Sequence, residues 1–103
     1  MSDRLPQLMK LLAVDPEDAD VPYMIALEHA KSGDPESAVE WLDKALALDP
    51  GYHYAYYQKA KMLSEIGQDE AGLAVLDAGL KRANADGNAK AVGELQELRL
   101  AMQ

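Results

Sequence analysis

The chain has 103 residues, of which 49% are hydrophobic and 27% charged, and these proportions indicate one folded domain rather than a disordered chain. Its formal net charge of -8 predicts a surface that repels phosphate backbones and anionic lipid, so neither nucleic acid nor a membrane is an expected partner. It has no cysteine, which excludes disulfides, thiol catalysis and thiolate metal sites.

An internal repeat organises the chain, because residues 19–52 match residues 53–86 at an offset of 34. The identities fall on one face of each predicted helix and at the turn between helices, and self-similarity at a fixed period is typical of stacked supersecondary units. The identical pairs are Tyr23/Tyr57, Ala26/Ala60, Gly33/Gly67, Glu36/Glu70, Leu42/Leu76, Asp43/Asp77 and Leu46/Leu80.

Residues 4–18 match only the second helix of a unit, because segment 11–16 aligns with segment 45–50 at the same offset. Arg4 and Leu11 stand where the complete units have small residues. The sequence therefore predicts an N-terminal half-repeat, with no helix of its own packed over Leu11.

Residues 19–52 predict two antiparallel helices. Asp20 is expected to cap the first helix, and Gly33 to end it in the left-handed conformation. Asp34 is expected to cap the second helix. The Asp-Pro pair at Pro50 should end the second helix, since proline cannot continue the helical hydrogen-bond ladder.

Residues 53–86 repeat this pattern, with a helix over 54–66, a turn at Gly67 and a second helix over 69–82. Small residues recur where the helices should face each other, and they would let two helix axes approach closely. Glycine inside a helix costs up to about 1 kcal/mol relative to alanine, so its presence here suggests a packing reason. These small residues are Ala26, Ala38, Ala45, Ala60, Gly72 and Gly79.

The last segment, residues 87–103, predicts a single helix with no partner after it. Glu94 stands where Ala26 and Ala60 stand in the repeats, so we expect this helix to be a polar cap. Leu100 falls outside the buried stripe of the cap helix. That stripe consists of Ala91, Leu95, Leu98 and Met102.

The spacing of these residues resembles the tetratricopeptide repeat. The resemblance implies an all-α, right-handed superhelix of about six helices. Residues 1–103 would form a single domain, with half-repeat 4–18, repeats 19–52 and 53–86, and capping helix 87–103. Three positions depart from the family pattern: Pro22 replaces a frequent Trp, Lys59 a Leu, and Asn84 a Pro.

In this family the first helices of the repeats line a concave groove that holds peptide segments. The resemblance implies a protein or peptide partner, whose identity the sequence does not reveal. Tyrosine suits such a groove, because it combines a large apolar area with a polar tip. The alternative is that these rings pack between helices or are simply exposed, and Tyr56 is expected in the core. The predicted peptide-binding residues are Tyr23, Leu27, Tyr54, Tyr57, Gln58 and Lys61.

One known variety of this groove is not expected here. The carboxylate clamp that grips acidic chaperone tails needs basic and asparagine side chains at defined positions. The matching positions hold Tyr23, Leu27, Gln58, Asn88 and Val92, so the basic residues are missing. We therefore expect no binding of acidic chaperone tails by that clamp.

The sequence indicates no catalysis, no cofactor and no metal site. Its two histidines, His29 and His53, form no metal-binding or nucleophile motif. His29 stands where the repeat has a core aromatic residue, so packing is favoured over catalysis. Residues 1–52 carry eleven acidic and four basic side chains, which fits either solvated helix faces or an acidic patch for a basic partner.

Two further expectations concern assembly and location. The uncovered terminal helices favour a self-associating homodimer as the alternative to peptide binding. No apolar run approaches the roughly 20 residues of a membrane span. Gln7 and Lys10 interrupt the apolar stretch near the N-terminus, which argues against a signal peptide, so a cytoplasmic protein is expected.

Overall fold

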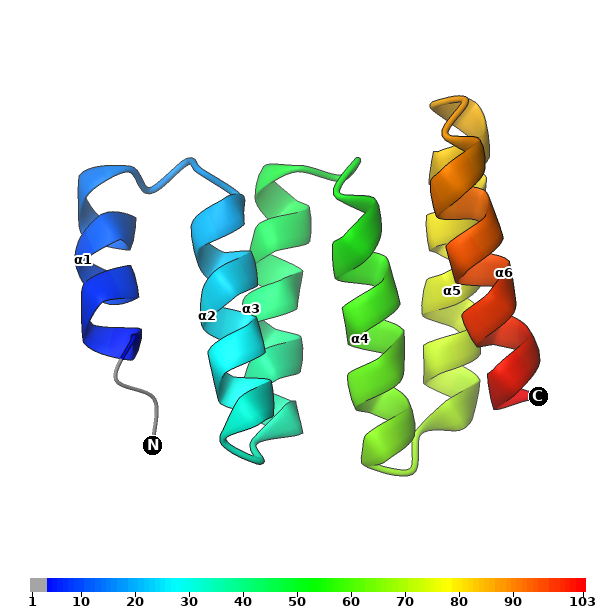
Figure 1. Ribbon diagram of the computed structural model, residues 1–103, viewed down its shortest axis with the longest axis horizontal. Helices are drawn as coiled ribbons and strands as arrows, with labels where there is room; N and C mark the ends of the chain where they lie inside the picture. The colour runs from blue at the N-terminus through cyan, green and yellow to red at the C-terminus, as the bar shows by residue number, and fades with distance from the viewer. Residues whose placement is uncertain (1–3) are drawn as a thin grey trace.

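Six antiparallel helices stand side by side in the computed structural model, which describes residues 4–103 (Figure 1). The all-α architecture predicted from the sequence is confirmed, and no strand occurs within this described range. In Figure 1, α2 lies in front of α3 and α6 in front of α5. The helices are α1 (Leu5–Val14), α2 (Asp20–Lys31), α3 (Pro35–Leu48), α4 (His53–Glu65), α5 (Asp69–Ala85) and α6 (Ala89–Met102).

The turns after α2 and α4 follow the sequence expectation. Gly33 and Gly67 have φ values of 78° and 79°, a left-handed conformation that glycine adopts at low cost. The Asp34 carboxylate then accepts a hydrogen bond of 3.1 Å from the Ser37 backbone N–H, which caps α3 as predicted. A left-handed glycine therefore reverses the chain in both central hairpins, and a capping aspartate follows it only in the first.

The expected cap at Asp20 is wrong, because Ala19 is the N-cap of α2 and makes no side-chain capping bond. Asp20 is already the first residue of α2, and its backbone N–H donates to the Asp18 carboxylate at 3.0 Å. Asp20 instead accepts a hydrogen bond of 2.7 Å from the Tyr52 hydroxyl. Its carboxylate therefore ties the start of α2 to the residue that precedes α4.

Small residues bring the helix backbones together, as the sequence predicts. Ala45 and Ala60 are both 0% exposed. A methyl group added at Gly79 would lie 2.8 Å from Tyr56 Cβ, which is closer than real Cβ contacts allow. Tyr56 packs against the core here, and its hydroxyl donates to the Pro50 carbonyl at 2.8 Å. The close contacts between small residues and the facing helices, which the sequence predicts, are therefore present.

Helix α1 is covered on one side only. Leu8 is its one buried residue and packs against Val21 and Ile25 of α2. Leu11 is 49% exposed, in agreement with the expectation that no helix covers it. Arg4 lies 3.7 Å from the Glu28 carboxylate, which adds an ion pair between the two helices.

The end of α5 differs from the prediction. Helix α5 continues to Ala85, because Asn84 does not stop it as the family's proline would. Gly87, with φ of 67°, and the Asn88 cap then turn the chain into α6. Leu95 is buried at 1% exposure, in agreement with the stripe predicted for the cap helix, and Glu94 is partly buried.

No helix within residues 4–103 is both long and apolar enough to cross a membrane.

Candidate functional site

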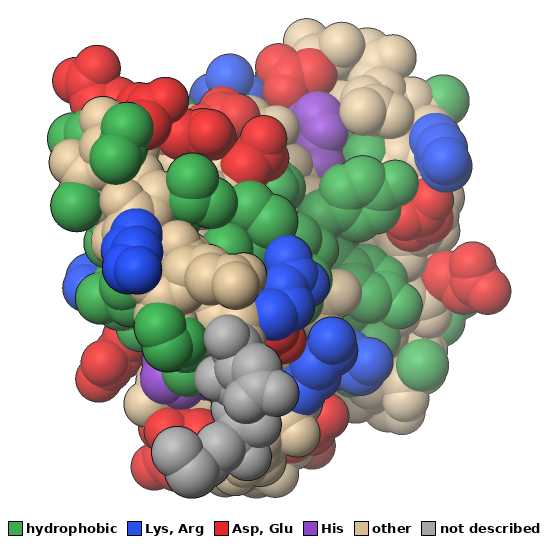
Figure 2. Space-filling model, turned by 60° about the vertical axis from the view of Figure 1, so that its left-hand side comes forward, with side chains coloured by type: hydrophobic (Ala, Val, Ile, Leu, Met, Phe, Trp, Pro, Cys, Tyr) green, Lys and Arg blue, Asp and Glu red, His purple; other side chains and the backbone are tan. Residues whose placement is uncertain are grey.

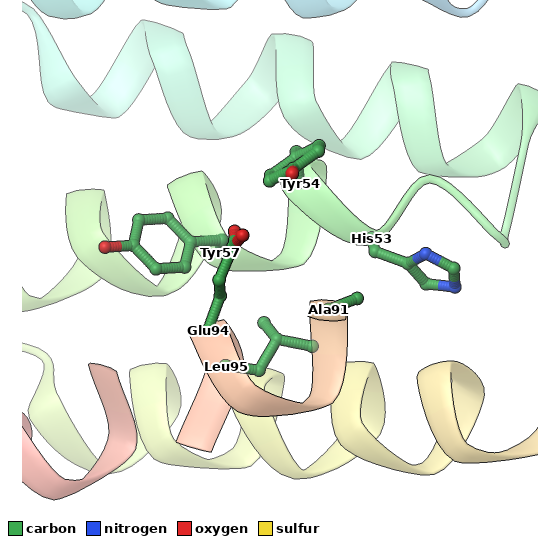
Figure 3. A pocket seen from close by; sticks show the side chains of 6 residues that line it. All are labelled: His53, Tyr54, Tyr57, Ala91, Glu94 and Leu95. Carbon is green, nitrogen blue, oxygen red and sulfur yellow. The ribbon is translucent and has the colours of Figure 1, made fainter. Parts of the chain in front are cut away.

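A narrow cleft separates α4 from α6. It is too tight to admit a water molecule, and two of the predicted site residues, Tyr54 and Tyr57, lie in its wall. Figure 3 shows the Glu94 side chain reaching from α6 toward α4, where it ends near these two tyrosines, whereas the His53 ring points away. The lining residues are His53, Tyr54, Tyr57, Ala91, Glu94 and Leu95.

A wider hollow continues from this cleft along α6. Its volume is about 380 Å³, and it opens to solvent. Tyr57 and Glu94 line both spaces, so the two lie next to each other along α4 and α6. The wider part is lined by Tyr57, Glu94, Glu97, Leu98 and Ala101. We call the two spaces together the α4–α6 groove.

The two groove tyrosines differ in how they are held. Tyr54 is 45% exposed, so nearly half of its surface is open to a partner. Tyr57 is half-buried and packs against the C-terminal core cluster, which fixes its ring. One tyrosine therefore offers free surface and the other a rigid wall.

Tyr23 lies on the other side of α4 and is part of a stacked pair. Its ring centroid lies 4.7 Å from that of Tyr52, and the ring planes differ by 23°. Burial raises the Tyr23 pKa above its usual 10.0, and a hydrogen bond with the Gln58 side chain partly offsets this. The Tyr52 pKa is also raised, first by burial and then by its bond to Asp20. Tyr23 therefore fits the alternative in which a ring packs between helices.

The structure thus brings the predicted residues together in two groups. Tyr54 and Tyr57 share the α4–α6 groove, while Gln58 pairs with Tyr23. Leu27 is half-buried on α2 and Lys61 is exposed on α4, and neither lines the groove.

A polar cluster fixes the end of the α4–α6 groove nearest the α5–α6 turn. His53 Nε2 lies 2.8 Å from the Asp86 carboxylate, and Asn88 Nδ2 lies 3.2 Å from His53 Nδ1. Arg82 donates to both Asp86 oxygens, at 3.2 and 3.1 Å. The His53 bond, and then the Arg82 bond, hold the Asp86 pKa below its usual 3.8. This cluster joins the start of α4 to the turn before α6, so it sets the spacing of the two groove walls.

Acidic side chains dominate the surface near the N-terminal end. Figure 2 shows them gathered along the upper edge of that face. The connection between α1 and α2 supplies Asp15, Glu17 and Asp18, and Asp20 follows in the first turn of α2. Among the described residues, no group of three His, Asp or Glu side chains could hold a metal ion.

Sequence reasoning missed three residues of the site: Tyr52, Glu94 and Glu97. Tyr52 lies before a helix, where helical spacing gives no signal. Glu94 was expected only as a polar residue of the cap helix, and Glu97 follows it by three residues on the same face of α6.

A family model described as the tetratricopeptide repeat matches residues 29–95, which is more than half of the chain. The chain belongs to the tetratricopeptide repeat family. This family fold is a protein–protein interaction module. No curated protein matches the chain in sequence.

Solved structures agree with this assignment. A tetratricopeptide repeat domain protein from Salinibacter ruber is 27% identical, with a TM-score of 0.79 over 86% of this chain and 90% of that one. The TPR2B domain of yeast Sti1, solved as a complex with pHsp70, has a TM-score of 0.86 at 24% identity, covering 92% of this chain and 76% of that one. A Bordetella parapertussis protein reaches 0.84 at 24% identity, over 99% and 89%. The Sti1 and Bordetella structures, each 24% identical to this chain, show only that the fold is shared.

Proposed function

We propose that this tetratricopeptide repeat protein is a protein–protein interaction adaptor without catalytic activity. It binds a peptide segment of a partner in the concave groove of the first helices, α2, α4 and α6. The residues proposed to contact the segment are Tyr23, Leu27, Tyr54, Tyr57, Gln58 and Lys61.

The observation that carries this proposal is the pair of tyrosines in the α4–α6 groove. Tyr54 is 45% exposed beside the half-buried Tyr57. An exposed tyrosine on a helix next to a cleft offers large contact area and loses little rotamer freedom on binding. Because Tyr57 is already held by the core, binding against it needs no further ordering of the wall.

The second group of residues would extend the contact along the molecule. Tyr23 is held by its stack on Tyr52, and Gln58 retains amide groups able to pair with a peptide backbone. Leu27 and Lys61 occupy matching positions one repeat apart, and they would contact the segment beyond the groove.

The yeast Sti1 domain is a complex with pHsp70, which supports a protein ligand for this fold. We do not propose that this chain binds an acidic tail. Asn88 and Val92 stand at the positions where the clamp has basic residues, and neither side chain carries a positive charge. Asn88 instead caps α6 and pairs with His53, and Val92 packs against the core. Binding of acidic chaperone tails by a carboxylate clamp is therefore excluded from the proposal.

A matched pair of substitutions tests the groove. Peptides would first be selected on the wild-type chain from a display library of random dodecapeptides. Tyr54→Ala is expected to weaken the selected peptides at least about tenfold, because it removes an exposed contact side chain. Met9→Ala is the control, since Met9 is 46% exposed on α1, away from the groove. Equal affinity for wild type and Tyr54→Ala in fluorescence anisotropy would remove the groove from the proposal.

Self-association is a second candidate, favoured by apolar side chains at both ends of the molecule. Val14 on α1 is 83% exposed and Leu100 on α6 is 71% exposed. Two copies could cover these surfaces with a two-fold interface. We expect light scattering to give a dimer mass that Leu100→Glu returns to the monomer value. A monomer mass at every concentration would exclude this candidate.

A further inference from the structure

Two carboxylates line the α4–α6 groove without a cation of their own. Glu94 and Glu97 lie three residues apart on α6, so both face the same space. The ion pairs found within residues 4–103 include neither of them. Their charges are therefore left to solvent or to a ligand.

The groove wall supplies no positive charge either. Neither part of the groove is lined by lysine or arginine. His53 is the one lining side chain able to become a cation, and its two ring nitrogens already pair with Asp86 and Asn88. Its ring also points away from the tyrosines (Figure 3). A basic ligand would therefore meet no lysine or arginine in the groove wall.

The aromatic rings in the groove also favour a cationic ligand. Tyr57 lines both parts of the groove beside Glu94, and Tyr54 lies in the same cleft. A lysine or arginine over an aromatic ring is attracted by the ring's negative face. Carboxylates within reach then form charge-assisted hydrogen bonds with its head group. The whole chain carries a net charge of -8, which attracts a basic segment at longer range.

We propose that the segment bound by this protein is basic, and that one of its lysine or arginine side chains lies against Tyr57 with its head group on Glu94 and Glu97. This inference rests on the proposed function and names the chemistry of the partner. It is opposite in charge to the acidic tails that a carboxylate clamp takes.

The test uses the selected dodecapeptides and two double variants with equal net charge. Glu94→Gln with Glu97→Gln removes the groove carboxylates while keeping their size. Glu36→Gln with Glu40→Gln is the control, because both residues are exposed on α3, which packs against α2 and α4. Circular dichroism melts would establish that both variants fold.

Three results support the inference together. The selected peptides are enriched in lysine or arginine, the groove variant binds them at least about tenfold more weakly, and the α3 control binds them nearly as wild type does. Replacing the basic residue of the peptide by glutamine should weaken wild type but scarcely affect the groove variant.

Other results would overturn it. Peptides that lose affinity on Tyr54→Ala but show neither basic enrichment nor sensitivity to Glu94→Gln with Glu97→Gln would leave the proposed groove intact and refute the basic ligand. Equal weakening in both double variants would assign the effect to net charge alone. Failure to select any peptide would refute both proposals.

Discussion

Gly79 and Gly93 both lie inside helices, but their surroundings differ. A Cβ added at Gly79 would meet Tyr56 Cβ and Cγ at 2.8 and 2.9 Å. Both atoms lie close to the α4 backbone and cannot move away freely. A Cβ added at Gly93 would meet nothing within 4 Å. The first glycine is therefore required by packing, whereas nothing in the packing requires the second.

Alanine substitutions at these two positions should have opposite effects. Gly79→Ala should lower the free energy of unfolding by about 1–3 kcal/mol, since the added methyl group overpacks the contact between α4 and α5. Gly93→Ala should raise it by up to about 1 kcal/mol through helix propensity. Urea unfolding followed by circular dichroism measures both. A stabilised Gly79→Ala variant would contradict the close approach of these helices.

At the scale of the element, the end of α5 decides where α6 packs. Asn84 stands at the family's proline position, yet α5 runs through it to Ala85. The Gly87 turn then forms hydrogen bonds of the same kind as the turns at Gly33 and Gly67, with Asn88 N–H donating to the Ala83 carbonyl at 3.0 Å. The α5–α6 connection is thus a glycine turn rather than an Asp-Pro turn.

Restoring the family residue should therefore destabilise this protein. Asn84→Pro would remove a backbone donor within α5 and clash with the preceding turn, at a cost of about 3 kcal/mol. Asn84→Ala is the matched control and should be close to neutral, because the Asn84 side chain is exposed. Thermal melts of the two variants compare them directly. An Asn84→Pro variant as stable as wild type would show that α5 ends earlier.

At the scale of the whole molecule, a few polar contacts link successive hairpins across their connections. The connections α1–α2, α3–α4 and α5–α6 all lie at the upper edge in Figure 1. The Tyr52 hydroxyl links the α3–α4 connection to the start of α2 by donating to Asp20. His53, at the start of α4, links to the α5–α6 connection through Asp86. Lys59 of α4 also pairs with Asp43 of α3, at 2.6 Å. These contacts fix the angle between hairpins, and with it the shape of the concave face.

Two carboxylates with lowered pKa values, Asp86 and Asp34, predict how the stability of the protein changes in acid. The pKa of Asp86 is lowered by His53, and that of Asp34 mainly by the Ser37 hydroxyl, both from a usual value of 3.8. A lowered folded-state pKa gives stability that is complete above the unfolded value and is lost as the pH falls through the folded value. We therefore expect the free energy of unfolding to decrease below about pH 4.

Asp86→Asn isolates one part of this effect. Its deficit relative to wild type should be largest above about pH 4 and should shrink as the pH falls further, because the wild-type carboxyl group is then protonated as well. Urea midpoints measured across this range give the comparison. A deficit that stays constant from neutral to strongly acidic pH would contradict the role of the Asp86 charge.

The sequence by itself determined the two central hairpins. Gly33, Gly67 and Asp34 act through local backbone conformation and capping, which neighbouring residues decide. The sequence also predicted where small residues face a neighbouring helix, because the 34-residue repeat places them on facing helices. These residues include Ala45, Ala60 and Gly79.

Only the tertiary structure decided which side chains share the groove. Whether Tyr23 packs or projects depends on Tyr52, which comes from a different hairpin. Tyr57 and Glu94 border the same space only because α6 docks beside α4, two helices earlier in the chain. Contacts between distant segments follow from how whole helices dock against one another, and local sequence patterns do not encode that docking angle.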